Sequence, residues 1–298
     1  MTTRHLLDIT DLTVGELRQV LALSIAAPQP VLQGKGAALI FEKPSNRTRH
    51  SMEMAVVQLG GHPVYTRGEE VGLDTRESVE DVTRIMAGYH AVLAARVFAH
   101  STVERMAACS AVPVINMLSD RSHPLQALAD VITMRQHVGD IDGMKVAWVG
   151  DYNNVARSLA EAVLMLGGSF ALACPAGYDA DATEIARLRS IGGPVVQSTD
   201  PGVAVEGAHV VHTDTWISMG QEEESAARRK VFAPYLVDET LMDVAAPGAR
   251  FMHCMPAHRG EEVSAEVFDG PRSLVIEQGH HRLTAARGAI AFLVGASS

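Results

Sequence analysis

The amino-acid sequence predicts an α/β protein of two domains, each a doubly wound parallel sheet with helices on both faces. The chain has 298 residues, which suits two domains of about 150 residues each. Apolar residues make up 47% of the chain and charged residues 20%, as in ordinary globular proteins. Short β-rich runs alternate with longer segments of helical periodicity, and this alternation is typical of parallel sheets with crossover helices.

Seven apolar runs are predicted to form strands. In chain order they are residues 36–42, 91–96, 112–118, 145–150, 170–174, 208–213 and 249–254. The segments between them carry apolar residues at helical spacing, such as Met52, Val56 and Leu59. A domain boundary is expected within 124–140, and the polar segment 220–230 is expected to be an exposed loop.

Charge and cysteine content exclude several classes of protein. The formal net charge is −10, which argues against a nucleic-acid partner because phosphate backbones require a basic surface. No apolar run reaches the roughly 18 residues of a membrane span, and the N-terminus lacks the apolar core of a signal peptide. The three cysteines are widely spaced and odd in number, so we expect a reducing, cytoplasmic location.

Ligands of parallel sheets bind at the carboxyl ends of the strands, so the residues that follow each strand are the candidates for a site. The segment Ser45-Asn-Arg-Thr-Arg lies between a strand and an amphipathic helix. The side chains of Ser45, Arg47 and Thr48, together with free N–H groups of the first helical turn, would form a cradle for an oxyanion. The alternative is a capped helix with two exposed arginines.

Three further polar residues follow strands of the first half. Arg96 ends an apolar strand, and an arginine in that position usually requires an anionic partner. His123-Pro-Leu-Gln126 places a ring nitrogen and an amide on one helical face. One group that polarises a carbonyl and one that accepts from an NH₂ group would suit a carbamoyl group, although a histidine after a strand is often only structural.

In the second half, Asn154, Asp214 and Ser218 follow two predicted strands. A carboxylate can bind an ammonium group, and an asparagine amide or a helix-start N–H can bind a carboxylate. These residues together fit the α-amino-acid end of a ligand, although each alone is a common turn or cap residue. The run Gly150-Asp-Tyr-Asn-Asn lacks G-x-G-x-x-G spacing, which disfavours a dinucleotide site.

The pair His253-Cys254 ends the last predicted strand. Zinc is an obvious hypothesis for such a pair, but no second Cys/His pair at ligand spacing exists and adjacent strand residues point to opposite faces. No metal is therefore expected. Cys254 is either a buried thiol or a polar neighbour of a reacting amine.

Four motifs occur in one order: S-x-R-T-R at 45–49, H-P-x-Q at 123–126, D-x-x-x-S-M-G at 214–220 and H-C-x-P-A-H-R-G at 253–260. With these motifs in this order, the chain resembles the aspartate/ornithine carbamoyltransferase family over essentially its whole length. The S-M-G segment is the feature of the ornithine-type members. The resemblance implies transfer of the carbamoyl group of carbamoyl phosphate to the δ-amine of L-ornithine, giving citrulline and phosphate.

The resemblance also implies an architecture and an assembly. Residues 1–135 would form the carbamoyl phosphate domain, residues 136–282 the ornithine domain, and a C-terminal helix at 283–298 would cross back to the first domain. The working unit would be a homotrimer or an assembly of trimers, with no cofactor and no metal. The residues leave open whether the cell runs the reaction towards arginine synthesis or towards arginine breakdown.

By matching positions, the resemblance assigns a role to each candidate residue. The carbamoyl phosphate set is Ser45, Asn46, Arg47, Thr48, Arg96, His123, Gln126, Cys254, Met255 and Arg282. Within it, the residues expected to act on the reacting groups are Arg96, His123, Gln126, Cys254 and Arg282. The ornithine set is Asn154, Asp214, Ser218 and Met219.

The chain departs from the family pattern at three places. Asn46 stands where Thr is usual, and Gly72 stands where many members supply a glutamine to a neighbouring subunit's phosphate. The segment 278–281 is Gln-Gly-His-His where many members have Gln-Ala-Glu-Asn. The rival hypotheses are a carbamoyltransferase for putrescine or an acylated ornithine, and a catalytically silent ligand-binding relative.

Overall fold

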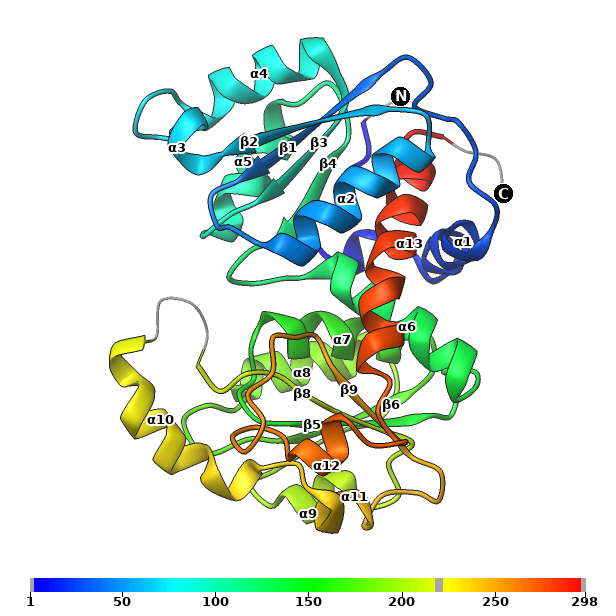
Figure 1. Ribbon diagram of the computed structural model, residues 1–298, viewed down its shortest axis with the longest axis vertical. Coiled ribbons are helices and arrows are strands. Elements are labelled where there is room, and N and C mark those ends of the chain that lie inside the picture. Colours follow the sequence, from blue (N-terminus) through cyan, green and yellow to red (C-terminus); the bar gives the residue numbers. More distant parts are fainter. Residues whose placement is uncertain (1–2, 218–221, 296–298) are drawn as a thin grey trace. The chain divides into compact units, whose positions relative to one another are not determined.

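A computed structural model describes residues 3–217 and 222–295 of the chain (Figure 1). The chain divides into two compact units: unit 1 contains residues 1–129 and 280–298, and unit 2 contains residues 130–279. Both chain connections between the units run through helices, namely α6 (Pro124–His137) and α13 (Val275–Leu293). Within the described residues, no helix is long and apolar enough to cross a membrane.

Unit 1 contains a four-stranded parallel sheet with the order β2-β1-β3-β4. Its strands are β1 (Gly36–Phe41), β2 (His62–Arg67), β3 (His90–Arg96) and β4 (Val114–Leu118). The helices that precede or follow them are α1 (Val14–Ile25), α2 (Asn46–Gln58), α3 (Gly68–Val71), α4 (Val79–Tyr89) and α5 (His100–Cys109).

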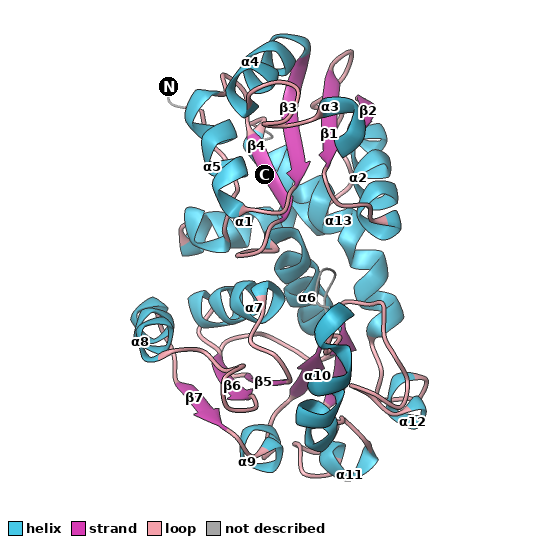
Figure 2. Ribbon diagram, turned by 90° about the vertical axis from the view of Figure 1, so that its left-hand side faces the viewer, coloured by secondary structure: helices cyan, strands magenta, loops and turns pink. Residues whose placement is uncertain are grey.

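Helices cover both faces of this sheet, as doubly wound topology requires. Alternate residues of β1 and β3, among them Ile40 and Leu93, pack on Val82 of α4 and Met106 of α5. Figure 2 shows α4 and α5 on one side of the sheet and α2 and α13 on the other. Strands β1, β3 and β4 are therefore buried on both faces, which explains their continuous apolar sequences.

The C-terminal part of α13 belongs to unit 1 and is anchored there by polar contacts. Arg287 donates from Nη2 to the carbonyl oxygens of Ser24 and Ala26 at 2.7 and 2.9 Å. A Cβ at Gly288 would lie 2.7 Å from the carbonyl oxygen of Val20, so only glycine allows α13 to approach α1 this closely. The prediction of a C-terminal helix that returns to the N-terminal region is confirmed.

Unit 2 contains a five-stranded parallel sheet with the order β7-β6-β5-β8-β9. Its strands are β5 (Lys145–Val149), β6 (Ser169–Ala173), β7 (Val195–Ser198), β8 (Val210–Thr213) and β9 (Arg250–His253). Its helices include α7 (Asn154–Met165), α8 (Ala182–Ile191), α9 (Pro201–Val205), α10 (Ser225–Phe232), α11 (Glu239–Met242) and α12 (Ala265–Phe268).

This second sheet is also covered on both faces. Ala147 and Phe251 of the sheet pack with Val205 of α9, Met242 of α11 and Val267 of α12. Helices α7 and α8 lie on the opposite face (Figure 2). The predicted fold class, two doubly wound parallel-sheet domains, is confirmed.

The seven predicted strands are present with ends that differ by one or two residues, but two further strands were not predicted. They are β2 and β7, each at the edge of its sheet. The sequence of β2 begins His62-Pro63 and none of its residues is buried. Only one residue of β7 is buried. An edge strand tolerates proline and polar residues, so it lacks the apolar run by which the other strands were recognised.

The prediction of a loop across 220–230 is wrong for its second part, because α10 begins at Ser225. Its charges are not all solvated. Arg228 is buried, forms an ion pair with Asp151, donates to the carbonyl oxygen of Trp216 at 2.6 Å, and lies over the rings of Tyr178 and Phe232. Aromatic packing and pairing make this buried arginine a helix anchor, which a charge count cannot reveal.

Candidate active site

The N-terminus of α2 lies at the carboxyl end of β1 in unit 1. Ser45 is the N-cap: its hydroxyl oxygen accepts from the backbone N–H of Thr48, and its Oγ donates to Thr48 Oγ1 at 3.0 Å. Thr48 is buried, whereas Asn46 and Arg47 are exposed on the first helical turn. The structure therefore joins Ser45 and Thr48 and leaves the two residues between them at the surface of the unit.

Arg282 of α13 connects this helix start to α6. Its guanidinium donates from Nη2 to Thr48 Oγ1 at 2.7 Å and from Nη1 to Gln126 Oε1. All three side chains are at least nine-tenths buried, and they come from positions up to 234 residues apart in the chain. The guanidinium keeps its positive charge at neutral pH, which favours an anion nearby.

Arg96 and His123 extend the same positive region. Both side chains are buried. Arg96 is the last residue of β3, and His123 directly precedes α6. Burial, together with the nearby guanidiniums of Arg282 and Arg96, holds the pKa of His123 well below its usual range. Burial and the charge of Arg96 likewise lower the pKa of the neighbouring Lys43 ammonium group. His123 is therefore a neutral imidazole at pH 7, which can donate one N–H to an oxygen without adding charge.

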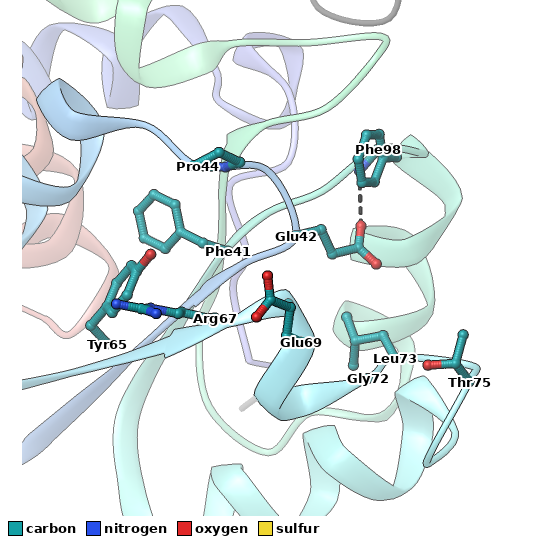
Figure 3. A pocket seen from close by; sticks show the side chains of 11 residues that line it. Phe41, Glu42, Pro44, Tyr65, Arg67, Glu69, Gly72, Leu73, Thr75 and Phe98 are labelled. Carbon is teal, nitrogen blue, oxygen red and sulfur yellow. Dashed lines mark hydrogen bonds between the residues drawn. The ribbon is translucent and has the colours of Figure 1, made fainter.

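A cavity of about 520 Å³ lies beside this region, on the side of β2 and α3. Glu42 and Glu69 line it, and Glu42 accepts a hydrogen bond from the backbone N–H of Phe98 at 2.9 Å (Figure 3). Arg67 lines it as well, so the cavity carries side chains of both charges. Gly72 also lines it with φ of 54°, and a Cβ there would lie 2.8 Å from Cβ of Arg76. A glutamine at this position would be strained, so the loop has a conformation that suits glycine.

In unit 2, Asp214 follows β8 and collects three donors. Its Oδ1 accepts from the Cys254 thiol at 3.0 Å and from the Thr215 N–H at 2.8 Å, and its Oδ2 accepts from Nδ2 of Asn153 at 2.9 Å. Two predicted residues, Asp214 and Cys254, are thus in direct contact although 40 positions separate them. A carboxylate held in this way is oriented for a further cation.

The sequence prediction missed the contribution of Asn153. Its Oδ1 caps α7 by accepting from the N–H groups of Val155 and Ala156, both at 3.0 Å, while its amide group contacts Asp214. The signal was present in the Asn-Asn pair, because the first residue of such a pair before a helix is the natural N-cap. Asn154, the predicted residue, is the first residue of α7. Ser218 and Met219 lie outside the described residues.

The ligand atoms of Asp214, His253 and Cys254 lie within 4.8 Å of one another, a group that in principle could hold a metal ion. The donor set does not suit one. His253 Nδ1 already accepts from the N–H of Met255 at 2.8 Å, and Nε2 lies 3.3 Å from a carboxylate oxygen of Glu262. With Nδ1 engaged and Nε2 beside the Glu262 carboxylate, Asp214 and Cys254 remain as ligands, fewer than a zinc site requires.

Residues 4–136 match the carbamoyl-P binding domain of aspartate/ornithine carbamoyltransferase, and residues 142–293 match the Asp/Orn binding domain. A relative described as ornithine carbamoyltransferase, anabolic, from Pyrococcus furiosus is 43% identical, with 98% of this chain and 96% of the relative covered.

Solved structures agree with the family models. Ornithine carbamoyltransferase from Pyrococcus furiosus superposes with a TM-score of 0.94 at 42% identity, covering 100% of this chain and 99% of the other. An acetylornithine transcarbamylase complexed with acetylcitrulline gives a TM-score of 0.88 at 28% identity, covering 98% and 99%. With both domain models matched in order along nearly its full length, this chain belongs to the aspartate/ornithine carbamoyltransferase family.

Proposed function

We infer that this protein transfers the carbamoyl group of carbamoyl phosphate to the δ-amine of L-ornithine, giving citrulline and phosphate. The relative from Pyrococcus furiosus, covered almost in full, is an ornithine carbamoyltransferase, and the matched family models describe domains that bind carbamoyl phosphate and aspartate or ornithine. The observation that carries the inference within the structure is the buried contact of Arg282 with Thr48 and Gln126, which concentrates positive charge and neutral hydrogen-bonding groups at one place.

We assign the phosphate to the start of α2. Ser45, Asn46, Arg47 and Thr48 occupy the N-cap and first turn of this 13-residue helix, where backbone N–H groups are free and the helix dipole is positive. The exposed Arg47 would add a charge-assisted contact from the solvent side.

The carbonyl oxygen of the carbamoyl group is assigned to Arg96, His123 and Arg282. This oxygen becomes negative in the tetrahedral intermediate, and donors placed around it before the reaction stabilise that charge. A neutral His123 can donate a hydrogen bond to this oxygen without adding a third positive charge beside the two guanidinium groups. The Gln126 side-chain oxygen and the Met255 backbone carbonyl would accept from the carbamoyl NH₂ group.

The amino-acid end of ornithine is assigned to Asn154, Asp214, Ser218 and the backbone N–H of Met219. Asp214 is the natural partner of the α-ammonium group, because the contacts from Cys254, Thr215 and Asn153 fix its orientation. Cys254 would lie beside the δ-amine.

The reaction then follows from placement and proton transfer. The δ-amine attacks the carbonyl carbon, the C–O bond to phosphate breaks, and the departing phosphate accepts the proton lost from nitrogen. The amine must attack as the free base although an unperturbed lysine-like amine has a pKa of about 10.4, and burial of the ammonium group lowers that value. Holding both reactants in attack geometry contributes up to about 7–11 kcal/mol.

We also propose a homotrimer, or an assembly of trimers, in the cytoplasm, with no cofactor and no membrane or nucleic-acid partner. No disulfide joins Cys109, Cys174 and Cys254, which fits a reducing compartment. We propose the synthetic direction, towards arginine, on the likeness to the anabolic relative. The glycine at position 72 implies that another residue of the 72–76 loop supplies any contact with a neighbouring subunit's phosphate.

A carbamoyl-transfer assay with a panel of amines tests the proposal, and the likeness to an acetylornithine enzyme decides the panel. We expect ornithine to be preferred over aspartate, putrescine and N-acetylornithine by at least about a hundredfold, because a polar group that faces a built partner discriminates strongly when it is lost. If aspartate or putrescine matched ornithine, the assignment of Asp214 and Ser218 would be wrong. Preference for N-acetylornithine would favour the acylated substrate instead.

A further inference from the structure

Glu262 is a fully buried carboxylate to which the proposed reaction gives no role. It is 0% exposed, between β9 and α12 in unit 2. An ionised carboxylate in the interior is costly unless hydrogen bonds and charges compensate it. Its Oε1 accepts from the backbone N–H of His258 at 2.5 Å and lies 3.3 Å from Nε2 of His253. One oxygen atom thus contacts both ends of the segment 253–258.

The hydrogen bonds of His253 determine where its proton lies. Its Nδ1 accepts from the N–H of Met255 at 2.8 Å, so Nδ1 carries no proton. A ring proton is therefore on Nε2, which lies 3.3 Å from Oε1 of Glu262. Burial alone would raise the pKa of Glu262, but the hydrogen bonds from His253 and from the His258 backbone lower it below its usual range. The carboxylate is ionised at pH 7 and fixes the ring through Nε2.

The ring in turn holds a backbone conformation that does not form easily. Met255 has φ of 56°, a value that non-glycine residues adopt only where the surrounding structure supports it. The thiol of the preceding residue, Cys254, donates a hydrogen bond to Asp214. The backbone N–H of His253 donates to Oε1 of Gln278 at 2.8 Å. Glu262 contacts the His253 ring, and that ring contacts the backbone of Met255. Glu262 is therefore linked through His253 to the Cys254 thiol and to the Met255 backbone carbonyl.

We propose that Glu262 is a positioning residue: through His253 and the His258 N–H it holds the segment 254–258 so that the Cys254 thiol and the Met255 carbonyl keep their orientation. The part of this inference that concerns turnover rests on the proposed carbamoyl transfer. The part that concerns the geometry of Cys254 does not.

The first test compares the kinetics of Glu262→Ala and Glu262→Gln with those of the unchanged protein. In Glu262→Ala we expect kcat with ornithine to fall by about tenfold to a hundredfold and KM for ornithine to rise, because small displacements of groups near the reacting atoms are costly. The Kd of carbamoyl phosphate should stay within about twofold. Glutamine keeps an oxygen that can accept both hydrogen bonds, so Glu262→Gln should recover most of the loss.

A double-mutant cycle identifies the route of the effect. In His253→Asn the side-chain amide can still accept from Met255 but no longer reaches Glu262. If Glu262 acts largely through the ring, Glu262→Ala should cost at least about fivefold less in the His253→Asn background than in the native one, as coupled neighbours are not additive. Full additivity of the two losses would contradict the route through His253.

The matched control is Glu161→Ala, which removes another fully buried carboxylate of unit 2, one that forms ion pairs with Arg157 and Arg187. It should lower the melting temperature as much as Glu262→Ala while leaving kcat and KM unchanged. If Glu262→Ala also only lowered the melting temperature, its role would be structural and the proposal would be overturned.

A second readout does not depend on the reaction. The alkylation rate of Cys254 by iodoacetamide is measured by peptide mass spectrometry, with the buried Cys174 as an internal reference. When the segment loosens, the thiol loses its contact with Asp214, and we expect Cys254 in Glu262→Ala to react at least about fivefold faster than in Glu161→Ala. Equal rates would overturn the positioning role. Absence of citrulline from the unchanged protein would instead count against the proposed function.

Discussion

In unit 1 three candidate site residues are buried side chains brought together from distant segments, whereas in unit 2 two candidate residues lie on turns that directly follow strands. Thr48, Gln126 and Arg282 illustrate the first arrangement, in which one guanidinium joins two helices. Asp214 and Cys254 illustrate the second, in which a carboxylate and a thiol follow β8 and β9. The first arrangement provides charge in a fixed place, and the second provides orientation that depends on backbone turns.

This difference predicts different responses to mutation. Removing a buried charge from unit 1 should act on catalysis through electrostatics, whereas loosening a turn in unit 2 should act on the amine selectively. The following substitutions test that contrast, beginning with the largest expected effect.

The largest effect is expected at Arg282. Arg282→Ala removes the donors to Thr48 and Gln126 and the buried positive charge, so we expect kcat to fall by about 10²–10³-fold, as for loss of a single donor to a developing oxyanion. Steady-state kinetics and far-UV circular dichroism on the same preparation check it. Arg282→Lys should restore only part of the rate, because a single ammonium nitrogen does not reproduce the planar fork whose two Nη atoms reach Gln126 and Thr48. A rate within tenfold of the original for Arg282→Ala would refute the electrostatic role.

A smaller and more selective effect is expected at Cys254. Cys254→Ala removes the thiol that contacts Asp214, so turnover should fall by about tenfold and KM for ornithine should rise, while carbamoyl phosphate affinity stays unchanged. Cys174→Ala is the matched control, since that buried thiol lies just after β6 and burial raises its pKa. The control should lower the melting temperature alone. Normal kinetics in a destabilised Cys254→Ala would remove this residue from the site.

Arg47 should show an effect on binding with the fold retained. Because its side chain is exposed, Arg47→Ala should weaken carbamoyl phosphate binding by about tenfold, measured by calorimetric titration. The matched control is Arg49→Ala, two residues on, whose guanidinium pairs with Glu53 and stacks on Tyr65. Normal affinity in Arg47→Ala would mean that the phosphate binds elsewhere.

The smallest effect concerns the scaffold of unit 2. Burial would raise the pKa of Glu184, but hydrogen bonds from Arg187 and Tyr152 lower it to about 2 from the usual 4.5. A lowered folded-state pKa contributes stability above pH 4.5 that is lost as the pH falls through that window towards 2. Glu184→Gln should therefore lower the melting temperature at pH 7 by about 3 °C and flatten its decline in acid. An unchanged acid profile, with kinetics at pH 7 as before, would show that this carboxylate contributes nothing to acid sensitivity.

Particular residues show which elements of the fold could be predicted from the sequence and which could not. Buried central strands such as 36–42 can be recognised in the sequence by their continuous apolar runs. The start of the helix at Ser45 can be recognised by its N-cap residue. The edge strand β7 has no such run, because one side of it remains unpaired. Arg228 looked like one charge of a solvated segment, since only the folded chain places Tyr178 and Asp151 around it.

Candidate site residues show the same limit. Arg96 could be selected because it ends a strand and His123 because it follows one, whereas Arg282 was identified only through family resemblance. Its partner Gln126 is 156 residues away, and nothing local marks a helix residue as a distant donor. Glu262 was not predicted at all, because a glutamate in a polar run is normally solvated and only its burial reveals the contact with His253.

Calorimetric titration of both reactants into two variants tests the central contrast most directly. Arg47→Ala alters unit 1, and Asp214→Asn removes the charge of the oriented carboxylate in unit 2. Carbamoyl phosphate is titrated alone, and ornithine in the presence of saturating phosphate. We predict that Arg47→Ala weakens carbamoyl phosphate and Asp214→Asn weakens ornithine, each by about tenfold or more, with the other ligand within about twofold. If Asp214→Asn weakened carbamoyl phosphate as much as ornithine, the division of the two reactants between the two units would be contradicted.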